Sequence, residues 1–180
     1  MSLFTPVNFR DVGEMVQIIS DFPNLPVNVL YRGGKIDEFN IPSHIGKSRT
    51  IINLRRGKDP IMEGVKNIHI PAQNSVDNYN TFDQSVRYWI KSTIHAILDI
   101  NNIGPYYIHC TSGRDRTGII VAALLYILGI SADCIREEYM LSDNTNIDLI
   151  NKALDGFRHW VTLKSDYYDL LVNKITATST

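Results

Sequence analysis

The chain is poor in cysteine and has no long apolar segment. Two cysteines, Cys110 and Cys134, are too few for a disulfide framework, and a reactive thiol suits a reducing compartment. No apolar run approaches the length that crosses a bilayer, and residues 1–6 lack the charged and apolar regions of a signal peptide. We therefore expect a cytoplasmic protein without an integral membrane segment, a pattern that leaves open export by a route without a recognisable signal.

A strong charge of either sign is also missing. The 18 Lys and Arg residues oppose 19 Asp and Glu residues, so the formal net charge is −1, which argues against nucleic-acid binding driven by general basicity. The histidines and cysteines show no spacing typical of metal ligands, so we predict no metal and no organic cofactor. The 180 residues, 44% of them hydrophobic, predict one globular domain over 1–180. Nothing in the pattern indicates an oligomeric state.

The apolar pattern predicts strands alternating with helices. β-branched and alternating runs mark strands, and a period of three to four residues marks helices. The expected strands are 27–31, 50–54, 67–70 and 105–108, and the expected helices are 81–100, 117–128, 131–141, 147–157 and 168–175. Thr81 and Gln84 form a capping-box pattern before the first of these helices. This order predicts a three-layer α/β domain with a central, mostly parallel sheet flanked by helices.

Residues 109–118, His-Cys-Thr-Ser-Gly-Arg-Asp-Arg-Thr-Gly, join the last expected strand to the most apolar helix. We call residues 110–116 the anion loop. A strand-loop-helix turn points successive backbone N–H groups at one centre, and the helix start adds unpaired N–H groups and a positive dipole end. Gly113 admits a backbone conformation closed to other residues. The residues expected to bind a phosphate group are Thr111, Ser112, Gly113, Arg114, Asp115 and Arg116.

Cys110 and Arg116 stand at the two ends of the anion loop. The thiolate is the nucleophilic form of cysteine, and the surrounding N–H donors and guanidinium favour it over the thiol. Arg116 presents a planar fork that holds two oxygens at once. Thr117 is placed to offer a hydroxyl to the sulfur, and His109 to orient the cysteine backbone. This set fits phosphoryl transfer to sulfur followed by hydrolysis.

Cys110, five residues, then Arg116, preceded by His109 and followed by Thr117-Gly118, resembles the signature of cysteine-dependent protein tyrosine and dual-specificity phosphatases. Supporting motifs are similar to those of a mostly microbial subfamily that includes the secreted mycobacterial tyrosine phosphatase and lipid-active relatives; they lie at 8–13, 30–34 and 51–55. The likeness covers about residues 8–141. It implies the same α/β fold and a phosphocysteine intermediate.

The reaction also needs a group that protonates the leaving oxygen and later takes a proton from water. Related enzymes often carry this aspartate in the loop before the long helix, here 71–80, but the aligned position is Asn74, and an amide is no useful acid. Asp77 lies three residues further on. Asp115 is the rival, because the resembling subfamily has an aspartate inside the anion loop. We favour Asp115, keep Asp77 as the alternative, and interpret Asp83 as structural.

The favoured substrate is phosphotyrosine in proteins. Phosphoinositides or inositol phosphates are the alternative, because Arg114 with Arg55 or Arg56 would supply charge for a multiply phosphorylated head group. The stretch that holds Arg55 and Arg56 is also typical of solvated surface. A phosphate-binding module without turnover is a third hypothesis, which the complete pair of Cys110 and Arg116 opposes.

Several residues outside the anion loop are expected to be structural. Residues 8–13 predict a turn against the core, in which Arg10 and Asp11 form hydrogen bonds. Arg32 is expected to form an ion pair, and Cys134 to pack in the core.

Overall fold

The computed structural model describes residues 5–20, 25–39 and 42–178, so residues 1–4, most of the stretch that we expected to lack a signal peptide, lie outside the described residues. In them the sheet has five strands: β1 Arg10–Asp11, β2 Leu30–Gly33, β3 Thr50–Asn53, β4 Lys66–His69 and β5 Tyr106–His109. The strand order is β1-β2-β5-β3-β4, with β1 antiparallel to β2 and the other neighbours parallel. The predicted mostly parallel sheet is confirmed.

The central strand β5 ends level with both of its neighbours. His109 pairs in register with Gly33 of β2 and with Asn53 of β3. All four residues of β5 are buried, as expected for a strand covered on both faces. Parallel sheets bind ligands beyond the carboxyl ends of their strands. The anion loop leaves β5 at this edge.

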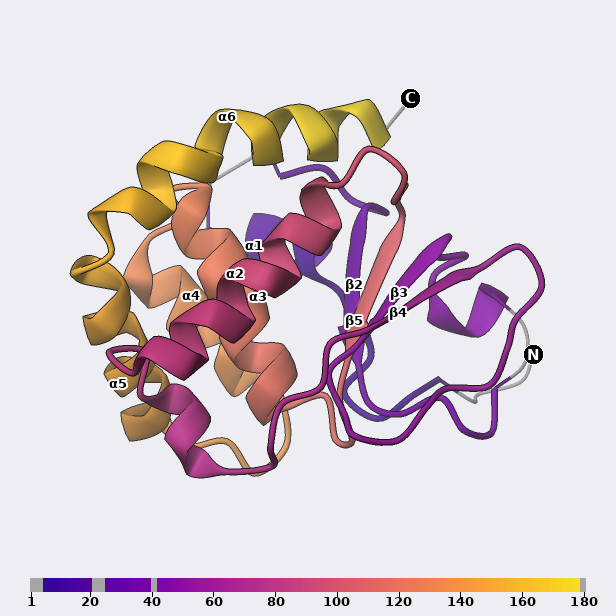
Figure 1. Ribbon diagram of the computed structural model, residues 1–180, viewed down its shortest axis with the longest axis horizontal. Helices are drawn as coiled ribbons and strands as arrows, with labels where there is room; N and C mark the ends of the chain where they lie inside the picture. The colour runs from indigo at the N-terminus through magenta and orange to yellow at the C-terminus, as the bar shows by residue number, and fades with distance from the viewer. Residues whose placement is uncertain (1–4, 21–24, 40–41, 179–180) are drawn as a thin grey trace.

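The α-helices are α1 Val12–Ile19, α2 Gln84–Leu98, α3 Asp115–Ile127, α4 Ala132–Met140, α5 Ile147–Arg158 and α6 Val161–Thr178, and the 3-10 helices are η1 Pro42–Ile45 and η2 Val76–Tyr79. Figure 1 shows the α-helices gathered on one side of the sheet, with η1 on the other. A smaller apolar cluster includes Tyr31, Ile36, Ile45, Ile51, Met62 and Tyr107. The α/β class is confirmed, and the layer opposite the α-helices consists of loop and 3-10 helix.

Helix α3 forms the centre of the larger core. It contacts β5 and the helices α2, α4, α5 and α6, and its residues from Arg116 to Leu125 are all buried. A helix that is apolar on every side is buried on every side, which is why residues 117–128 show no polar face. The helix begins at Asp115, two residues earlier than predicted, so its first turn belongs to the anion loop.

The capping pattern predicted at Thr81 is wrong. Helix α2 begins at Gln84, and Asp83 is its N-cap, with Oδ1 accepting hydrogen bonds from the N–H groups of Ser85 and Val86 at 2.8 and 3.2 Å. Thr81 is buried and donates its hydroxyl to the Ala153 carbonyl at 2.8 Å. A tertiary hydrogen bond thus takes the side chain that the local pattern assigned to the cap. The structural role expected for Asp83 is confirmed.

Residues 8–13 do more than form the predicted turn. Arg10 and Asp11 make the edge strand β1, and the Asp11 carboxylate then caps α1, accepting from Gly13 N at 2.8 Å. Arg10 Nε donates to Glu138 at 2.8 Å. The structural roles expected for both side chains are confirmed, but the sequence pattern missed α1 altogether.

The final helix is longer than predicted. It runs over Val161–Thr178, and the expected segment, 168–175, is its second half, where Leu171 and Ile175 are buried. None of the helices in the described part of the chain is both long enough and apolar enough to span a bilayer.

Candidate active site

The anion loop adopts the strand-loop-helix geometry that its sequence predicts. Cys110 follows β5 directly and is buried. Gly113 has a φ of 71°, and a Cβ there would lie 2.3 Å from the carbonyl carbon of Gly33. Only glycine tolerates both the positive φ and this backbone contact. Arg114, at the N-cap of α3, makes no side-chain capping hydrogen bond, so the first-turn N–H groups keep their capacity for an anion.

Four consecutive carbonyls of the anion loop are bound by groups outside it. The bonds run from His109 Nδ1 to Cys110 O (3.2 Å), Lys35 N to Thr111 O (3.0 Å), Asn8 Nδ2 to Ser112 O (2.9 Å) and Arg32 to Gly113 O (2.8 Å). In a trans peptide the N–H points opposite to the carbonyl. Because the carbonyls are held outward, the N–H groups of residues 111–114 point the other way, which is the arrangement of an anion-binding nest.

Arg116 is buried at the start of α3, and its side chain reaches the segments that follow β3 and β4. Its terminal nitrogens donate to Leu54 O and to Thr111 Oγ1, both at 3.1 Å, and to Asn74 Oδ1 at 3.4 Å. Its Nε is buried and has no hydrogen-bond partner among the described residues. A buried guanidinium N–H without an acceptor is costly. An oxyanion in the nest would satisfy it.

The predicted hydrogen bond from Thr117 to the sulfur is not formed. Thr117 is fully buried, and its Oγ1 has no partner in the described part of the chain. Thr117 is the third residue of α3 and is packed inside the core, so the helix backbone restricts the directions open to its side chain.

A buried ion cluster supports the anion loop from beneath. Arg32 is fully buried and pairs with Glu138 Oε2 at 2.6 Å while donating to Gly113 O. Arg10 pairs with Glu138 Oε1 at 2.8 Å. The ion pair expected for Arg32 is therefore confirmed. Removing one partner from such a buried group leaves an uncompensated charge, so the cluster fixes the backbone of the anion loop firmly.

Asp115 lies in a groove beside the anion loop, with both carboxylate oxygens hydrogen-bonded. Oδ1 accepts from the Tyr79 hydroxyl at 2.8 Å, and Oδ2 accepts from Arg114 Nε at 3.0 Å. Arg114 also donates to Asn144 O at 3.1 Å. The groove has a volume of about 210 Å³, and its polar lining residues include Asn74, Ser75, Tyr79, Arg114, Asp115 and Asn146. The geometry thus places Asp115, Arg114 and Asn74 around one groove.

Asp77 lies elsewhere. It is the second residue of η2, where the hydroxyl of Ser75 donates to Asp77 Oδ2 at 2.7 Å, and it is exposed. It lines a separate groove of about 530 Å³ with Asp83 and Trp89. Asp77 is not among the residues that line the groove of Asp115. The two candidate acids therefore open onto different grooves.

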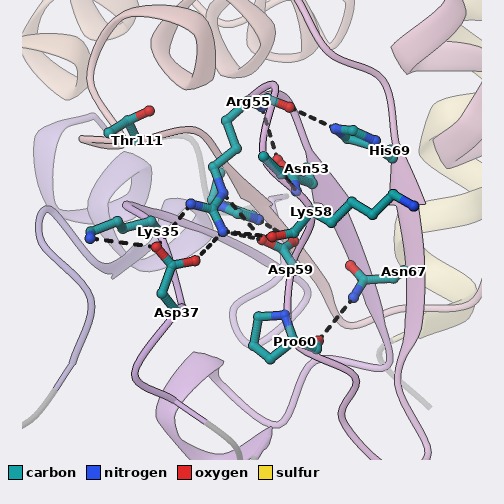
Figure 2. Close-up of polar contacts among 12 residues, drawn as sticks. Lys35, Asp37, Asn53, Arg55, Lys58, Asp59, Pro60, Asn67, His69 and Thr111 are labelled. Atoms are coloured by element: carbon teal, nitrogen blue, oxygen red, sulfur yellow. Dashed lines mark hydrogen bonds and ion pairs between the residues drawn. The ribbon is translucent and has the colours of Figure 1, made fainter.

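The histidine before the cysteine has an acidic partner that sequence reasoning missed. His109 Nε2 lies 2.7 Å from Asp59 Oδ2, and both side chains are almost wholly buried. Asp59 also accepts from Arg55, whose guanidinium pairs with Asp37, as Figure 2 shows. These hydrogen bonds from Arg55 lower the pKa of Asp37. The spacing of four between Arg55 and Asp59 is the one sequence signal that could have indicated part of this network.

The network also distinguishes the two arginines of the cationic stretch that follows β3. The Arg55 side chain is 11% exposed and holds two carboxylates, so it is a structural residue, whereas Arg56 is exposed. Cys134 packs in the core on α4, where burial raises the pKa of its thiol. The packing role expected for Cys134 is confirmed.

Comparisons with known proteins agree with the geometry. A family model described as the tyrosine phosphatase family matches residues 1–179. The chain is 28% identical over 119 residues to OCA1 of Kluyveromyces lactis, a provisionally named tyrosine-protein phosphatase, covering 61% of this chain and 56% of that protein. It is 31% identical over 70 residues to the triple specificity protein phosphatase PtpB of Mycobacterium tuberculosis, covering 38% of this chain and 25% of that one. The matched segments thus span about half of the length of OCA1 and a quarter of the length of PtpB.

Solved structures share the fold. The core catalytic domain of the PP-IP phosphatase SIW14 from S. cerevisiae is 18% identical, covers 93% of this chain and 95% of its own, and superposes with a TM-score of 0.60. DUSP15 is 17% identical, covers 82% of this chain and 90% of its own, and gives a TM-score of 0.53. At these identities the likeness concerns the fold alone.

Proposed function

The chain belongs to the tyrosine phosphatase family, and on that premise we propose that it hydrolyses phosphomonoesters through a thiolate nucleophile and a phosphocysteine intermediate. The observation that carries the proposal is the outward binding of four consecutive carbonyls in the anion loop, beside the buried Cys110 and the unpartnered Nε of Arg116. Such a nest binds a tetrahedral dianion next to a nucleophile. We also propose that residues 1–180 form one catalytic domain.

In the first proposed step the Cys110 sulfur attacks phosphorus. The S–P bond forms, the P–O bond to the leaving group breaks, and the leaving oxygen takes a proton from the acid. Arg116 and the nest hold the phosphoryl oxygens throughout, so the charge that builds on them is stabilised by donors already in place. In the second step water attacks phosphorus, the S–P bond breaks, and the water proton passes to the same carboxylate. No step needs a metal or an organic cofactor.

We assign the acid to Asp115. The support is its place on the groove that also contains Arg114 and Asn74, whose amide accepts from Arg116. Asp77, the alternative, lines a separate groove, and in the described part of the chain its side chain bonds to Ser75 rather than to the anion loop. An acid must come within hydrogen-bond reach of the leaving oxygen, which favours Asp115, because its groove also contains Asn74, a hydrogen-bond partner of Arg116.

We propose phosphotyrosine in proteins as the substrate. The relatives whose sequences align are named as a tyrosine-protein phosphatase and as a triple specificity protein phosphatase. Phosphoinositides or inositol phosphates are the second candidate, because Arg114 and the amides of Asn74 and Asn146 line one groove and would bind additional phosphates and hydroxyls. A reactive thiolate needs a reducing environment, so we propose a cytoplasmic location.

The first test measures phosphate release by the wild type and by Cys110→Ser. The substrates are a phosphotyrosine peptide, a phosphoserine peptide, a phosphoinositide in vesicles and a soluble inositol phosphate, each with and without a chelator. We expect release from the phosphotyrosine peptide, unaffected by chelator and absent in the variant. Preference for either inositol compound would make the second candidate the function. Binding of phosphate analogues without release from any substrate would leave a binding module, and inhibition by chelator would contradict the metal-free mechanism.

A further inference from the structure

Asp59 is a buried carboxylate that touches the site without being part of the anion loop. It lies in the loop that follows β3, 50 residues from His109 in sequence, and its side chain is 1% exposed. Asn53, at the end of β3, is the register partner of His109. The loop after β3 therefore folds back over the carboxyl ends of the strands and carries Asp59 to the far side of His109 from Cys110. A buried carboxylate needs a positive partner or donors.

The hydrogen bonds of His109 indicate how many protons its ring carries. Nε2 lies 2.7 Å from Asp59 Oδ2, and Nδ1 lies 3.2 Å from the carbonyl oxygen of Cys110. A carbonyl oxygen has no hydrogen to give, and the Asp59 carboxyl group accepts from the Arg55 guanidinium on its other oxygen, so both partners of His109 act as acceptors. A neutral imidazole has a single N–H and would leave one of these oxygens facing a lone pair. The imidazolium satisfies both.

The surroundings hold this pair in one orientation. Tyr107, on the same strand, stacks on the His109 ring with centroids 5.3 Å apart and planes at 14°. Asp59 Oδ1 accepts from Arg55 Nε at 3.3 Å and from a terminal nitrogen of Arg55 at 3.1 Å. Among the described residues, the charged and titratable groups near His109 include Asp59 and, behind it, Arg55 from the loop after β3, with Tyr107 and Cys110 on its own segment and Arg32 on the neighbouring strand β2. Figure 2 shows Arg55 lying between Asp59 and Asp37.

We propose that Asp59 is a positioning residue that keeps His109 doubly protonated, so that a positive charge and a fixed Cys110–Thr111 peptide support the Cys110 thiolate. The imidazolium is closer to Cys110 than the carboxylate is, so the sum of the two charges favours the thiolate. The bond to the Cys110 carbonyl also turns the N–H of Thr111 into the nest. The inference rests on the proposed function insofar as the thiolate is the nucleophile.

The test is the pH dependence of Cys110 alkylation by iodoacetamide, read by mass spectrometry so that Cys134 is counted separately. In Asp59→Asn the side-chain shape stays while the charge goes, and His109 loses the reason for its second proton. We expect the alkylation midpoint to rise by about one pH unit, which is about tenfold slower reaction below the midpoint. Asp155→Asn, the same substitution at an exposed ion pair on α5, should leave the profile in place. An unchanged midpoint, or a fall, overturns the proposal.

A second measurement uses the wild type alone, so it does not depend on whether a variant folds. Nitrogen-15 NMR of labelled histidine in the wild type reports the protons on each ring nitrogen, and we expect both nitrogens of His109 to be protonated at about pH 7. A singly protonated ring overturns the proposal. Neither readout requires turnover, so an inactive wild type with a doubly protonated His109 would refute the proposed function and keep this inference. An active wild type whose alkylation profile is unchanged in Asp59→Asn would support the proposed function and refute this inference.

Discussion

The hydroxyl of Tyr79 donates to Asp115 Oδ1 over 2.8 Å and lies 2.7 Å from the hydroxyl of Tyr139. The two tyrosine rings meet edge to face, with centroids 6.3 Å apart. Burial, reinforced by the neighbouring Tyr139, raises the pKa of Tyr79 well above its ordinary value. Tyr79 therefore keeps its proton at every pH used for assays, and Asp115 always has this donor. One carboxylate oxygen of Asp115 is therefore held by this hydrogen bond.

Tyr79→Phe removes a donor that favours the ionised form of Asp115. If Asp115 is the acid, it then stays protonated to higher pH, and the basic limb of the kcat/KM profile moves up by about one pH unit. Tyr88→Phe, at a residue 74% exposed, is the matched control and should leave the limb unchanged. A basic limb that ignores Tyr79 would show that Asp115 does not set it.

Exchanging the two candidate acids one at a time separates them. We expect Asp115→Asn to lower kcat on a phosphotyrosine peptide by about 100-fold and to flatten the basic limb, since general acid catalysis contributes about that much or more. We expect Asp77→Asn to stay within about twofold of the wild type, as an exposed turn residue should. The reverse result in pH–rate profiles would transfer the role of acid to Asp77.

Arg116→Lys keeps the charge but loses the planar fork. Because the nest and the fork together stabilise the phosphoryl oxygens, we expect kcat/KM to fall by about 100-fold or more. Arg158→Lys, on the surface of α5 with 58% of its side chain exposed, serves as the control. Steady-state kinetics check both variants. Activity of Arg116→Lys within roughly threefold of the wild type would contradict the role of Arg116 as an oxyanion clamp.

Two glycines with similar dihedral angles allow strain to be separated from crowding. Gly113 has φ 71° and Gly64 has φ 74°, yet a Cβ at Gly113 meets the backbone of Gly33 and Gly34 within 2.6 Å, while one at Gly64 meets nothing within 4 Å. We expect Gly64→Ala to cost about 1 kcal/mol of unfolding free energy and no activity. Gly113→Ala should cost at least about 3 kcal/mol and abolish turnover. Equal losses in urea unfolding would contradict this.

The Asp37–Arg55 ion pair predicts a stability difference that depends on pH. Hydrogen bonds from Arg55 lower the pKa of Asp37, so the pair stabilises the fold above the ordinary aspartate pKa of about 3.9 and is lost as the pH falls through the lowered value. The carboxylate is 39% exposed, so solvent screens the pair. Asp37→Asn should reduce the unfolding free energy by about 1 kcal/mol or less at neutral pH, and the difference should vanish once the pH lies below the lowered pKa of Asp37. Thermal unfolding across this range is the measurement.

Features that depend on neighbours in sequence were predictable. An apolar run, a glycine and an apolar helix pattern predict the strand-loop-helix around Cys110, and the structure has all three. Arg32 was recognisable as structural because a lone arginine at a strand end seldom stays unpaired in a core. The family signature added the role of the loop, which composition alone does not supply.

Features that depend on distant partners were not predictable. Asp59 lies 50 residues from His109, and Tyr79 lies 36 residues from Asp115, so no local pattern links them. The cap at Asp83 was misjudged because Thr81 is engaged by Ala153, which lies 72 residues away. The family resemblance favoured Asp115 over Asp77, but only the structure shows that the two carboxylates line different grooves.

The Glu138 cluster has a consequence for the growing chain. Glu138 lies 128 residues after Arg10 and 106 after Arg32, and Arg32 holds the carbonyl of Gly113. A ribosome therefore completes the Cys110 segment before it adds the carboxylate that stabilises Arg32 beneath it. Until α4 emerges and docks, Arg10 and Arg32 lack the carboxylate that pairs with them in the folded protein. The order of synthesis thus places the last support of the anion loop after the loop itself has been made.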